Sequence, residues 1–115
     1  MTSEPINWED YGIYDASGLP ADWQVVVDLD HGGGYEWTIF RAFWSPTERR
    51  YFWSGGSGCS CNYWDQDLRT PGDFASGDRA ALQRAFRSFA GEHEYSVTGA
   101  DAIDTTATIS TFKES

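Results

Sequence analysis

Alternation of apolar and polar side chains between Trp23 and Asp30 restricts the fold of this chain more than any other feature of its sequence. Gln24, Asp28 and Asp30 fall on one side of an extended segment. The other side holds the apolar set Trp23, Val25, Val27 and Leu29. A period of two residues is typical of a β-strand with one buried face. We therefore expect a half-buried strand that begins at Trp23.

Two further β segments are predicted directly after this one. Residues 35–44 place apolar side chains on both faces, which indicates a central strand covered on both sides; the two sets are Tyr35, Trp37, Ile39 and Phe43 against Phe40, Ala42 and Trp44. The sequence predicts turns at 31–34 and at 45–48, the second with Pro46, and a third, antiparallel strand at 49–54. The glycines at 55–58 are expected to end that strand.

The clearest helix pattern runs from about Gly77 to Ala90, where large or apolar side chains recur at helical spacing: Leu82, Ala85, Phe86 and Phe89. Ser76 or Asp78 can cap the N-terminus, and Gly91 is expected to end the helix. The opposite face carries Arg79, Gln83, Arg84 and Arg87. We expect one amphipathic helix packed on the sheet.

The remaining segments complete a predicted single domain over residues 1–115. Residues 1–22 are rich in Pro, Gly, Asp and Ser but contain enough apolar residues to dock as an irregular arm, and 55–75 is expected to be a Gly- and Cys-containing loop before a helix at 76–91. The β-prone composition of 94–112 predicts C-terminal strands. The expected fold class is α+β, an antiparallel sheet of about four to five strands with one amphipathic helix on one face.

Negative charge is concentrated at the start of the chain. The net charge is −10, and residues 1–40 contain eight acidic residues and no Lys or Arg. An acidic surface repels nucleic acids and anionic membranes, so a protein with a basic surface is the expected partner. Seven of the acidic residues form the candidate binding face: Glu4, Glu9, Asp10, Asp15, Asp22, Asp28 and Asp30.

The Gly58-Cys59-Ser60-Cys61 turn allows three kinds of chemistry. A zinc site needs about four ligands, and only His31 and His93 are available to join the two cysteines. A disulfide between residues two apart would close a tight, easily reduced ring and give a redox site. The third interpretation, which the sequence favours, is that both thiols stay free and pack as small buried apolar side chains.

Residues 28–34, with the sequence Asp-Leu-Asp-His-Gly-Gly-Gly, match two functional motifs only in part. An EF-hand calcium loop requires a bidentate Glu at its twelfth position, where Ile39 stands, and its fifth ligand position is Gly32. An esterase oxyanion loop requires a Gly-x-Ser-x-Gly nucleophile motif, and Ser57 lacks the last glycine. Carboxylate or His31 catalysis cannot be established from spacing. We expect a protein that is not an enzyme and has no cofactor.

Aromatic residues are numerous, with six Trp, six Tyr and seven Phe. Trp44, Tyr51 and Trp53 are candidates for a stacking platform that binds sugars or nucleobases, although core packing is the favoured use. We expect the nearby arginines to stack on rings or to pair with the acidic arm and tie it to the sheet; they are Arg41, Arg49 and Arg50.

The string from Tyr51 to Trp64, with Asp67-Leu68 just after it and an amphipathic helix to follow, resembles small uncharacterised proteins of actinobacteria and their phages. In those proteins an aromatic strand runs into a Gly-Cys-Ser-Cys turn. The resemblance covers roughly a third of the chain, and Asn62 stands where many members have Pro. It implies provenance and a similar fold, and no activity is assigned to that family.

Together these observations predict a small acidic accessory protein, phage-encoded by resemblance, that acts by binding another protein. Residues 1–9 lack the basic start and apolar run of a secretory signal, so we expect a cytoplasmic location, in the host cell for a phage protein. One alternative is a module that binds a sugar or nucleotide on surface aromatics. Another is a zinc or thiol-redox protein that uses Cys59 and Cys61.

Overall fold

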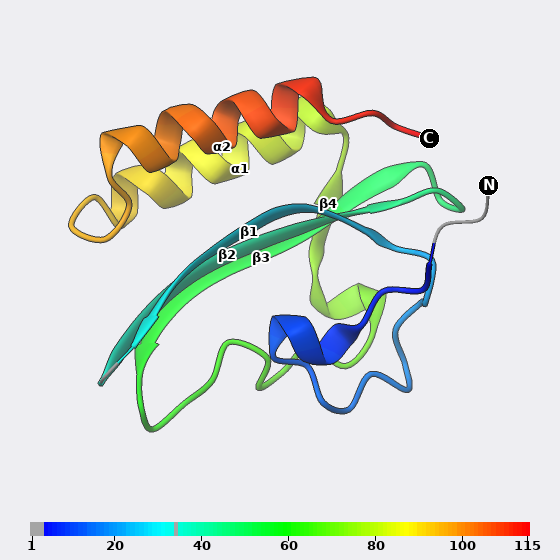
Figure 1. The fold of residues 1–115 in the computed structure, drawn as a ribbon, viewed down its shortest axis with the longest axis horizontal. Coiled ribbons are helices and arrows are strands. Elements are labelled where there is room, and N and C mark those ends of the chain that lie inside the picture. The colour runs from blue at the N-terminus through cyan, green and yellow to red at the C-terminus, as the bar shows by residue number, and fades with distance from the viewer. Residues whose placement is uncertain (1–3, 34) are drawn as a thin grey trace.

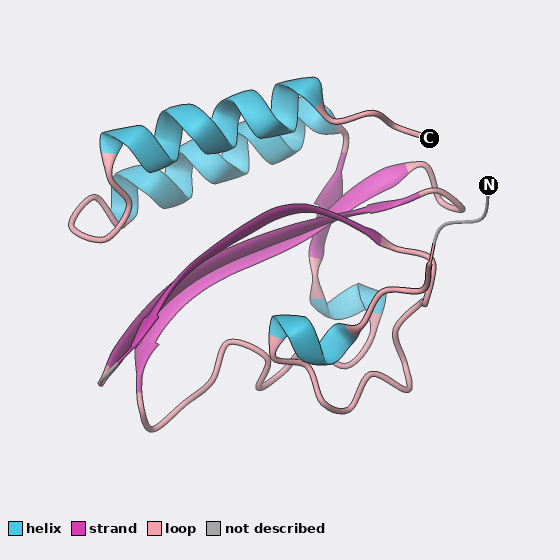
Figure 2. Cartoon of the chain, in the orientation of Figure 1, coloured by secondary structure: helices cyan, strands magenta, loops and turns pink. Residues whose placement is uncertain are grey.

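The computed structural model describes residues 4–33 and 35–115, and places two helices on one face of an antiparallel sheet (Figure 1). The strands, in spatial as well as chain order, are β1 (Gln24–Gly33), β2 (Glu36–Ser45), β3 (Arg50–Cys59) and β4 (Ala75–Gly77). The helices are α1 (Arg79–Glu92) and α2 (Gly99–Thr111). Short 3₁₀ helices, η1 (Trp8–Tyr11) and η2 (Pro71–Asp73), lie in the segments that cover the other face (Figure 2). The predicted α+β class is confirmed, with a second helix in addition to the expected one.

The central position predicted for β2 is confirmed. It lies between β1 and β3, and its side chains alternate between two cores. Phe40, Ala42 and Trp44 face the helices, whereas Ile39 and Phe43 face the opposite layer. A strand covered on both sides must be apolar on both faces. The turn predicted at 31–34 is wrong for its first three residues, because β1 continues to Gly33, and Gly34 lies outside the described residues.

β1 departs from strict alternation because it contains a β-bulge. Val25 pairs with Phe43 and Val27 pairs with Ala42, so that Val26 is an extra residue on the β1 side. Val26 and Val27 consequently both pack toward the helices, while Trp23 and Val25 pack on the other face. The prediction that Trp23, Val25, Val27 and Leu29 share one face of the strand is therefore wrong. An inserted residue moves every later side chain of the strand to the opposite face of the sheet.

The prediction that the glycines at 55–58 end the third strand is also wrong, because β3 continues through them to Cys59. Gly55 pairs with Phe40 across the sheet. A Cβ at Gly55 would lie 2.7 Å from the Phe40 ring and 2.8 Å from the Phe89 ring of α1. Glycine is thus required inside the strand, where it lets a helix side chain approach the sheet.

Helix α1 confirms the predicted amphipathic helix. Asp78 is its N-cap and accepts a hydrogen bond of 2.8 Å from the Ala81 amide, and Leu82, Phe86 and Phe89 are buried. The helix continues past Gly91 and ends at Glu92, with His93 as C-cap. Gly91 is helical and a Cβ there would meet nothing, so the residue does not act as a terminator.

Helix α2 replaces the strands predicted at 94–112. Thr98 and Asp101 form a capping box: the Thr98 hydroxyl accepts from the Asp101 amide at 3.1 Å, and the Asp101 carboxylate accepts from the Thr98 amide at 3.0 Å. Thr105 and Ile109, four residues apart, are buried against the sheet side. Capping and tertiary packing outweigh the β propensity of the threonines.

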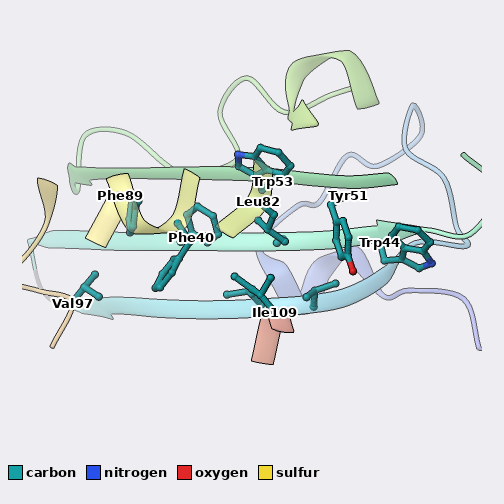
Figure 3. Close-up of a cluster of buried hydrophobic side chains, with 12 residues drawn as sticks. Phe40, Trp44, Tyr51, Trp53, Leu82, Phe89, Val97 and Ile109 are labelled. Carbon is teal, nitrogen blue, oxygen red and sulfur yellow. The ribbon is translucent and has the colours of Figure 1, made fainter. Parts of the chain in front are cut away.

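Two cores result, one on each face of the sheet. The helix-side core lies between the sheet and the two helices, and includes Phe40, Trp44, Tyr51, Trp53, Leu82, Phe86, Phe89, Val97 and Ile109 (Figure 3). The arm-side core lies between the sheet and segments 4–22 and 60–74, and includes Trp8, Ile13, Trp23, Phe43, Phe52, Trp64 and Phe74. We call segment 4–22 the arm and segment 60–74 the loop.

Candidate functional site

A cavity of about 650 Å³ opens on the arm side of the sheet, between the arm and the loop. Its floor is formed by strand residues, among them Asp30, Trp37 and Arg41. One wall comes from the arm and contains Glu9, Asp10, Tyr11 and Tyr14. The other wall comes from the loop and contains Tyr63, Trp64 and Asp65. We call this space the arm-side cavity; its volume falls in the range of small-molecule binding sites.

Arg41 lies on the floor of the cavity and is only 5% exposed. Its Nε donates to Asp28 and its Nη2 to Asp30, each at 2.8 Å, while Nη1 donates to the Tyr11 carbonyl, also at 2.8 Å. The guanidinium carbon lies 4.8 Å from the centre of the Trp64 ring and 5.9 Å from that of Tyr11. A buried charge requires such partners. The predicted stacking of Arg41 on neighbouring rings is confirmed. The predicted pairing with acidic residues of the arm is wrong, because both carboxylate partners lie in β1 and the arm is held through the Tyr11 carbonyl.

The arm wall is built around η1. Asn7 caps this short helix by accepting from the Glu9 amide at 3.3 Å, and Gly12 ends it with φ of +80°, a conformation that favours glycine. The Trp8 ring is buried, and its Nε1 donates to the Pro20 carbonyl at 3.1 Å. With Trp8 facing inward, the carboxylates of Glu9 and Asp10 are exposed at the cavity.

The loop wall is held by indole donors. Trp37 Nε1 donates to the carbonyls of Cys59 and Asn62, at 3.1 and 3.0 Å, and Trp64 Nε1 donates to the Ser54 carbonyl at 3.2 Å. Tyr63, the neighbour of Trp64, stays 69% exposed, and Tyr14 on the facing wall is 76% exposed. The cavity thus has two exposed aromatic rings, one on each wall.

The cavity is acidic. Four carboxylates line it, from Glu9, Asp10, Asp30 and Asp65, against the single guanidinium of Arg41. Asp30 is paired with Arg41, whereas none of the other three takes part in an ion pair among the described residues. Burial raises the pKa of the Tyr11 phenol, and the nearby Asp28 and Asp10 carboxylates raise it further, so Tyr11 stays protonated. Carboxylates beside exposed rings form an environment that attracts organic cations.

Comparison with known protein families matches residues 11–112 to a domain of unknown function, DUF7574. The chain belongs to the DUF7574 family. The matched region holds the floor of the cavity and its loop wall, while Glu9 and Asp10 precede it. Neither the curated proteins nor the solved structures give a match to this chain. Within the part of the chain that the structure describes, no helix is long and apolar enough to cross a membrane.

In this DUF7574 chain the structure brings together only part of the predicted acidic face. Glu9, Asp10 and Asp30 line the cavity, and Asp28 lies at its base as a partner of Arg41. The remaining residues lie elsewhere on the arm. Asp15 accepts from Ser17 at 3.0 Å, Asp22 accepts from Thr47 at 2.6 Å, and Glu4 is exposed near the start of the chain.

The aromatic residues of the cavity were not found from the sequence. The platform candidates Trp44, Tyr51 and Trp53 are all buried in the helix-side core, as the favoured core interpretation predicted. The residues that do line the cavity are Tyr11, Tyr14, Trp37, Tyr63 and Trp64. The sequence signal for these residues is that aromatic and acidic residues stand next to one another at Glu9–Tyr11 and at Tyr63–Asp65. Both segments lack the hydrophobic period of a helix or a strand.

The prediction that Cys59 and Cys61 are buried free thiols is wrong. Both residues are exposed, and a disulfide joins them at the point where β3 passes into the loop. The candidate zinc ligands are engaged otherwise: His31 Nε2 lies 2.8 Å from Asp101, and the His93 ring packs on Phe89 at 4.4 Å. In the described ranges, 4–33 and 35–115, no three His, Cys, Asp or Glu side chains cluster as metal ligands would.

Proposed function

We propose that this protein is a small acidic accessory protein that binds another protein with a basic surface, and that the arm-side cavity with its rim is the contact. The observation that supports this proposal is the charge arrangement. The only guanidinium that lines the cavity is already paired, whereas Glu9, Asp10 and Asp65 have no ion-pair partner among the described residues. A basic partner surface would supply their counter-charges.

Electrostatics would act at two ranges in such a complex. The net charge of −10 steers a basic partner toward the protein and repels nucleic acids and anionic lipids. At contact, the exposed Tyr14 and Tyr63 offer the amphipathic aromatic surface that is common in the centre of protein interfaces. The resemblance to actinophage proteins points to a host protein in the bacterial cytoplasm as the partner. This function requires no catalytic step and no cofactor.

Affinity capture with two charge-matched variants tests the proposal. The cavity variant carries Glu9→Gln, Asp10→Asn and Asp65→Asn. The control variant removes the same number of charges from exposed positions outside the cavity: Asp67→Asn, Glu94→Gln and Asp104→Asn. We expect a protein to be retained at low salt by the wild type and by the control, and to be lost with the cavity variant. Equal retention by both variants, or no retained protein at all, would contradict the proposal.

A second candidate function is the binding of a small neutral ligand, such as a sugar, on the aromatic walls. It is favoured by the volume of the cavity and by its exposed rings. Nucleotides are less suitable because their phosphates would meet the carboxylates of the rim. A thermal-shift screen separates the two functions, since a ligand at 100 times its Kd stabilises the protein by about 2.7 kcal/mol. Stabilisation by a sugar that persists at high salt would favour this second function.

A further inference from the structure

We infer that the arm-side cavity binds an arginine side chain of the partner, an inference that rests on the proposed function and specifies the group recognised. Arg41 already lines this cavity. The cavity already holds this guanidinium between two carboxylates, beside two aromatic rings and one backbone carbonyl. The elements that surround the cavity are therefore suited to a planar, delocalised cation.

A second set of the same groups also lines the cavity, and we call it the upper set. The exposed rings of Tyr14 and Tyr63 stand on opposite walls, in place of Tyr11 and Trp64. The carboxylates of Glu9, Asp10 and Asp65 stand in place of Asp28 and Asp30, and none of the three is ion-paired within the described ranges. Both tyrosines, Glu9 and Asp10 are exposed and Asp65 is half-buried, so an incoming side chain can reach this set.

Arginine fits this upper set better than lysine does. A guanidinium is weakly hydrated, stacks on aromatic rings, and forms two parallel hydrogen bonds to a carboxylate. An ammonium group is a compact, strongly hydrated charge that loses more on leaving water. The half-buried Trp37 and the buried Trp64 make part of the cavity surface apolar, which penalises the ammonium further.

Three short peptides test the inference directly: acetyl-Gly-Arg-Gly-amide and its counterparts with lysine and with citrulline, the neutral isostere of arginine. Binding is followed at low salt by NMR titration of the tryptophan indole N–H signals. Trp37 and Trp64 line the cavity, whereas Trp44 and Trp53 lie in the helix-side core and serve as internal controls. We expect the arginine peptide to shift the two cavity signals and to bind at least tenfold more tightly than the citrulline peptide.

Single substitutions then locate the contact. Tyr14→Ala or Tyr63→Ala should weaken arginine binding about two- to fivefold, the loss expected for one exposed cation–π contact. Tyr95→Ala and Asp67→Asn, both exposed and outside the cavity, should leave it unchanged. Because all these side chains are exposed or at the rim, unchanged thermal unfolding of each variant is the check that it has folded.

The results separate this inference from the proposed function. Equal binding of the arginine and citrulline peptides, equal binding of the lysine peptide, or shifts outside the cavity would overturn the arginine inference. If this occurs while the cavity variant still loses its partner in affinity capture, protein binding stands and the recognised group is another one. If arginine binds as expected but capture is unaffected by the cavity variant, the arginine site stands and the proposed partner contact is wrong.

Discussion

The two faces of the sheet are covered in different ways, and the cover determines which side chains each face needs. On the helix side, α1 and α2 satisfy most of their own backbone hydrogen bonds, so the side chains that pack beneath them, such as Leu82, Phe86 and Ile109, need no polar group. The polar atoms of Trp44 and Tyr51 in this core donate to the C-terminal segment, at Ser115 and Glu114. On the arm side, irregular segments leave backbone carbonyls that must find donors from side chains.

Tryptophan and arginine supply those donors on the arm side. Trp8, Trp37 and Trp64 each donate an indole N–H to a backbone carbonyl, and Arg41 donates to that of Tyr11. The phenylalanines of the helix-side core, such as Phe86 and Phe89, have no such group to offer. Three indoles and a buried cation thus hold the irregular cover, although the buried Nε1 of Trp23 has no hydrogen-bond partner among the described residues. The arm-side cavity lies between the segments of this cover. The arm-side cavity therefore lies on the face with the less regular cover.

The largest expected effect tests the apolar helix side. Phe86 is 1% exposed and packs edge-on against Phe40, with ring centres 5.2 Å apart. Phe86→Ala should lower the free energy of unfolding by about 3 to 5 kcal/mol, because it leaves a cavity in the core. The neighbouring Arg87 is exposed, so Arg87→Ala should cost under about 0.5 kcal/mol. Urea unfolding measures both, and equal losses would contradict the assigned helix face.

A smaller effect is expected from removing the buried cation of the arm side. Arg41→Met keeps the length of the side chain but leaves Asp28, Asp30 and the Tyr11 carbonyl without their donor. The two carboxylates are 40% and 43% exposed, so water can replace the lost donor. We therefore expect the free energy of unfolding to fall by about 2 to 3 kcal/mol, which is less than the full cost of an unpaired buried charge.

Arg49→Met is the matched control for that substitution. Arg49 also stacks on a tryptophan, Trp44 at 5.1 Å, but it is exposed, and its loss should cost under about 1 kcal/mol. If the two substitutions lower the urea midpoint equally, the arm side does not depend on Arg41 as the structure indicates.

The helix side was more predictable from the sequence than the arm side. The spacing of Leu82, Phe86 and Phe89 and the two apolar faces of β2 were both recognised, because regular elements repeat with a fixed period. The sequence predicts strands in place of α2 because its threonines favour strands, whereas the capping box between Thr98 and Asp101 favours the helix. The bulge at Val26 has no signal in an unbroken run of valines.

For the candidate site, the sequence indicated the sign of the charge but not its location. The acidic residues of the arm were identified, yet Asp15 and Asp22 do not line the cavity that Glu9 and Asp10 share with Asp65. This grouping depends on how the arm and the loop lie on the sheet, and irregular segments carry no period from which to predict that. A disulfide is one of the three interpretations of the Gly-Cys-Ser-Cys turn, but the sequence favours buried thiols. That preference is wrong because β3 continues to Cys59 and both cysteines are exposed.

The disulfide provides a test confined to the edge of the arm side. Cys59 and Cys61 are exposed, so replacing both by serine removes little packing. A ring of three residues restricts the unfolded chain weakly, by about 1.6 kcal/mol in the chain-entropy relation. Urea unfolding without reductant should therefore show that the double serine variant has a free energy of unfolding lower by about that amount. Once reductant is added, wild type and variant should have the same free energy of unfolding. Titration of two thiols in the native wild type would contradict the bond.

The smallest effect concerns the point where the helix side meets the β1–β2 hairpin, at Asp101. Its carboxylate accepts from the Thr98 amide at 3.0 Å and lies 2.8 Å from His31 of β1. The hydrogen bond from the Thr98 amide, followed by that with His31, lowers the pKa of Asp101 below its usual value. A carboxylate with a lowered folded-state pKa stabilises the protein above its unfolded-state pKa of about 4, and this contribution is lost as the pH falls through the folded-state pKa.

Asp101→Asn should therefore destabilise the protein at neutral pH. The difference in stability between wild type and variant should shrink toward zero as the pH becomes acidic. The measurement is thermal unfolding of wild type and variant at a series of pH values from neutral to about 2.5, a range that passes below the ordinary aspartate pKa. His31→Gln is the companion variant. It should preserve most of the pH dependence, because the Thr98 amide is the larger cause of the lowered pKa. If the loss of stability in Asp101→Asn is the same at every pH, the charge of Asp101 contributes nothing and its lowered folded-state pKa is contradicted.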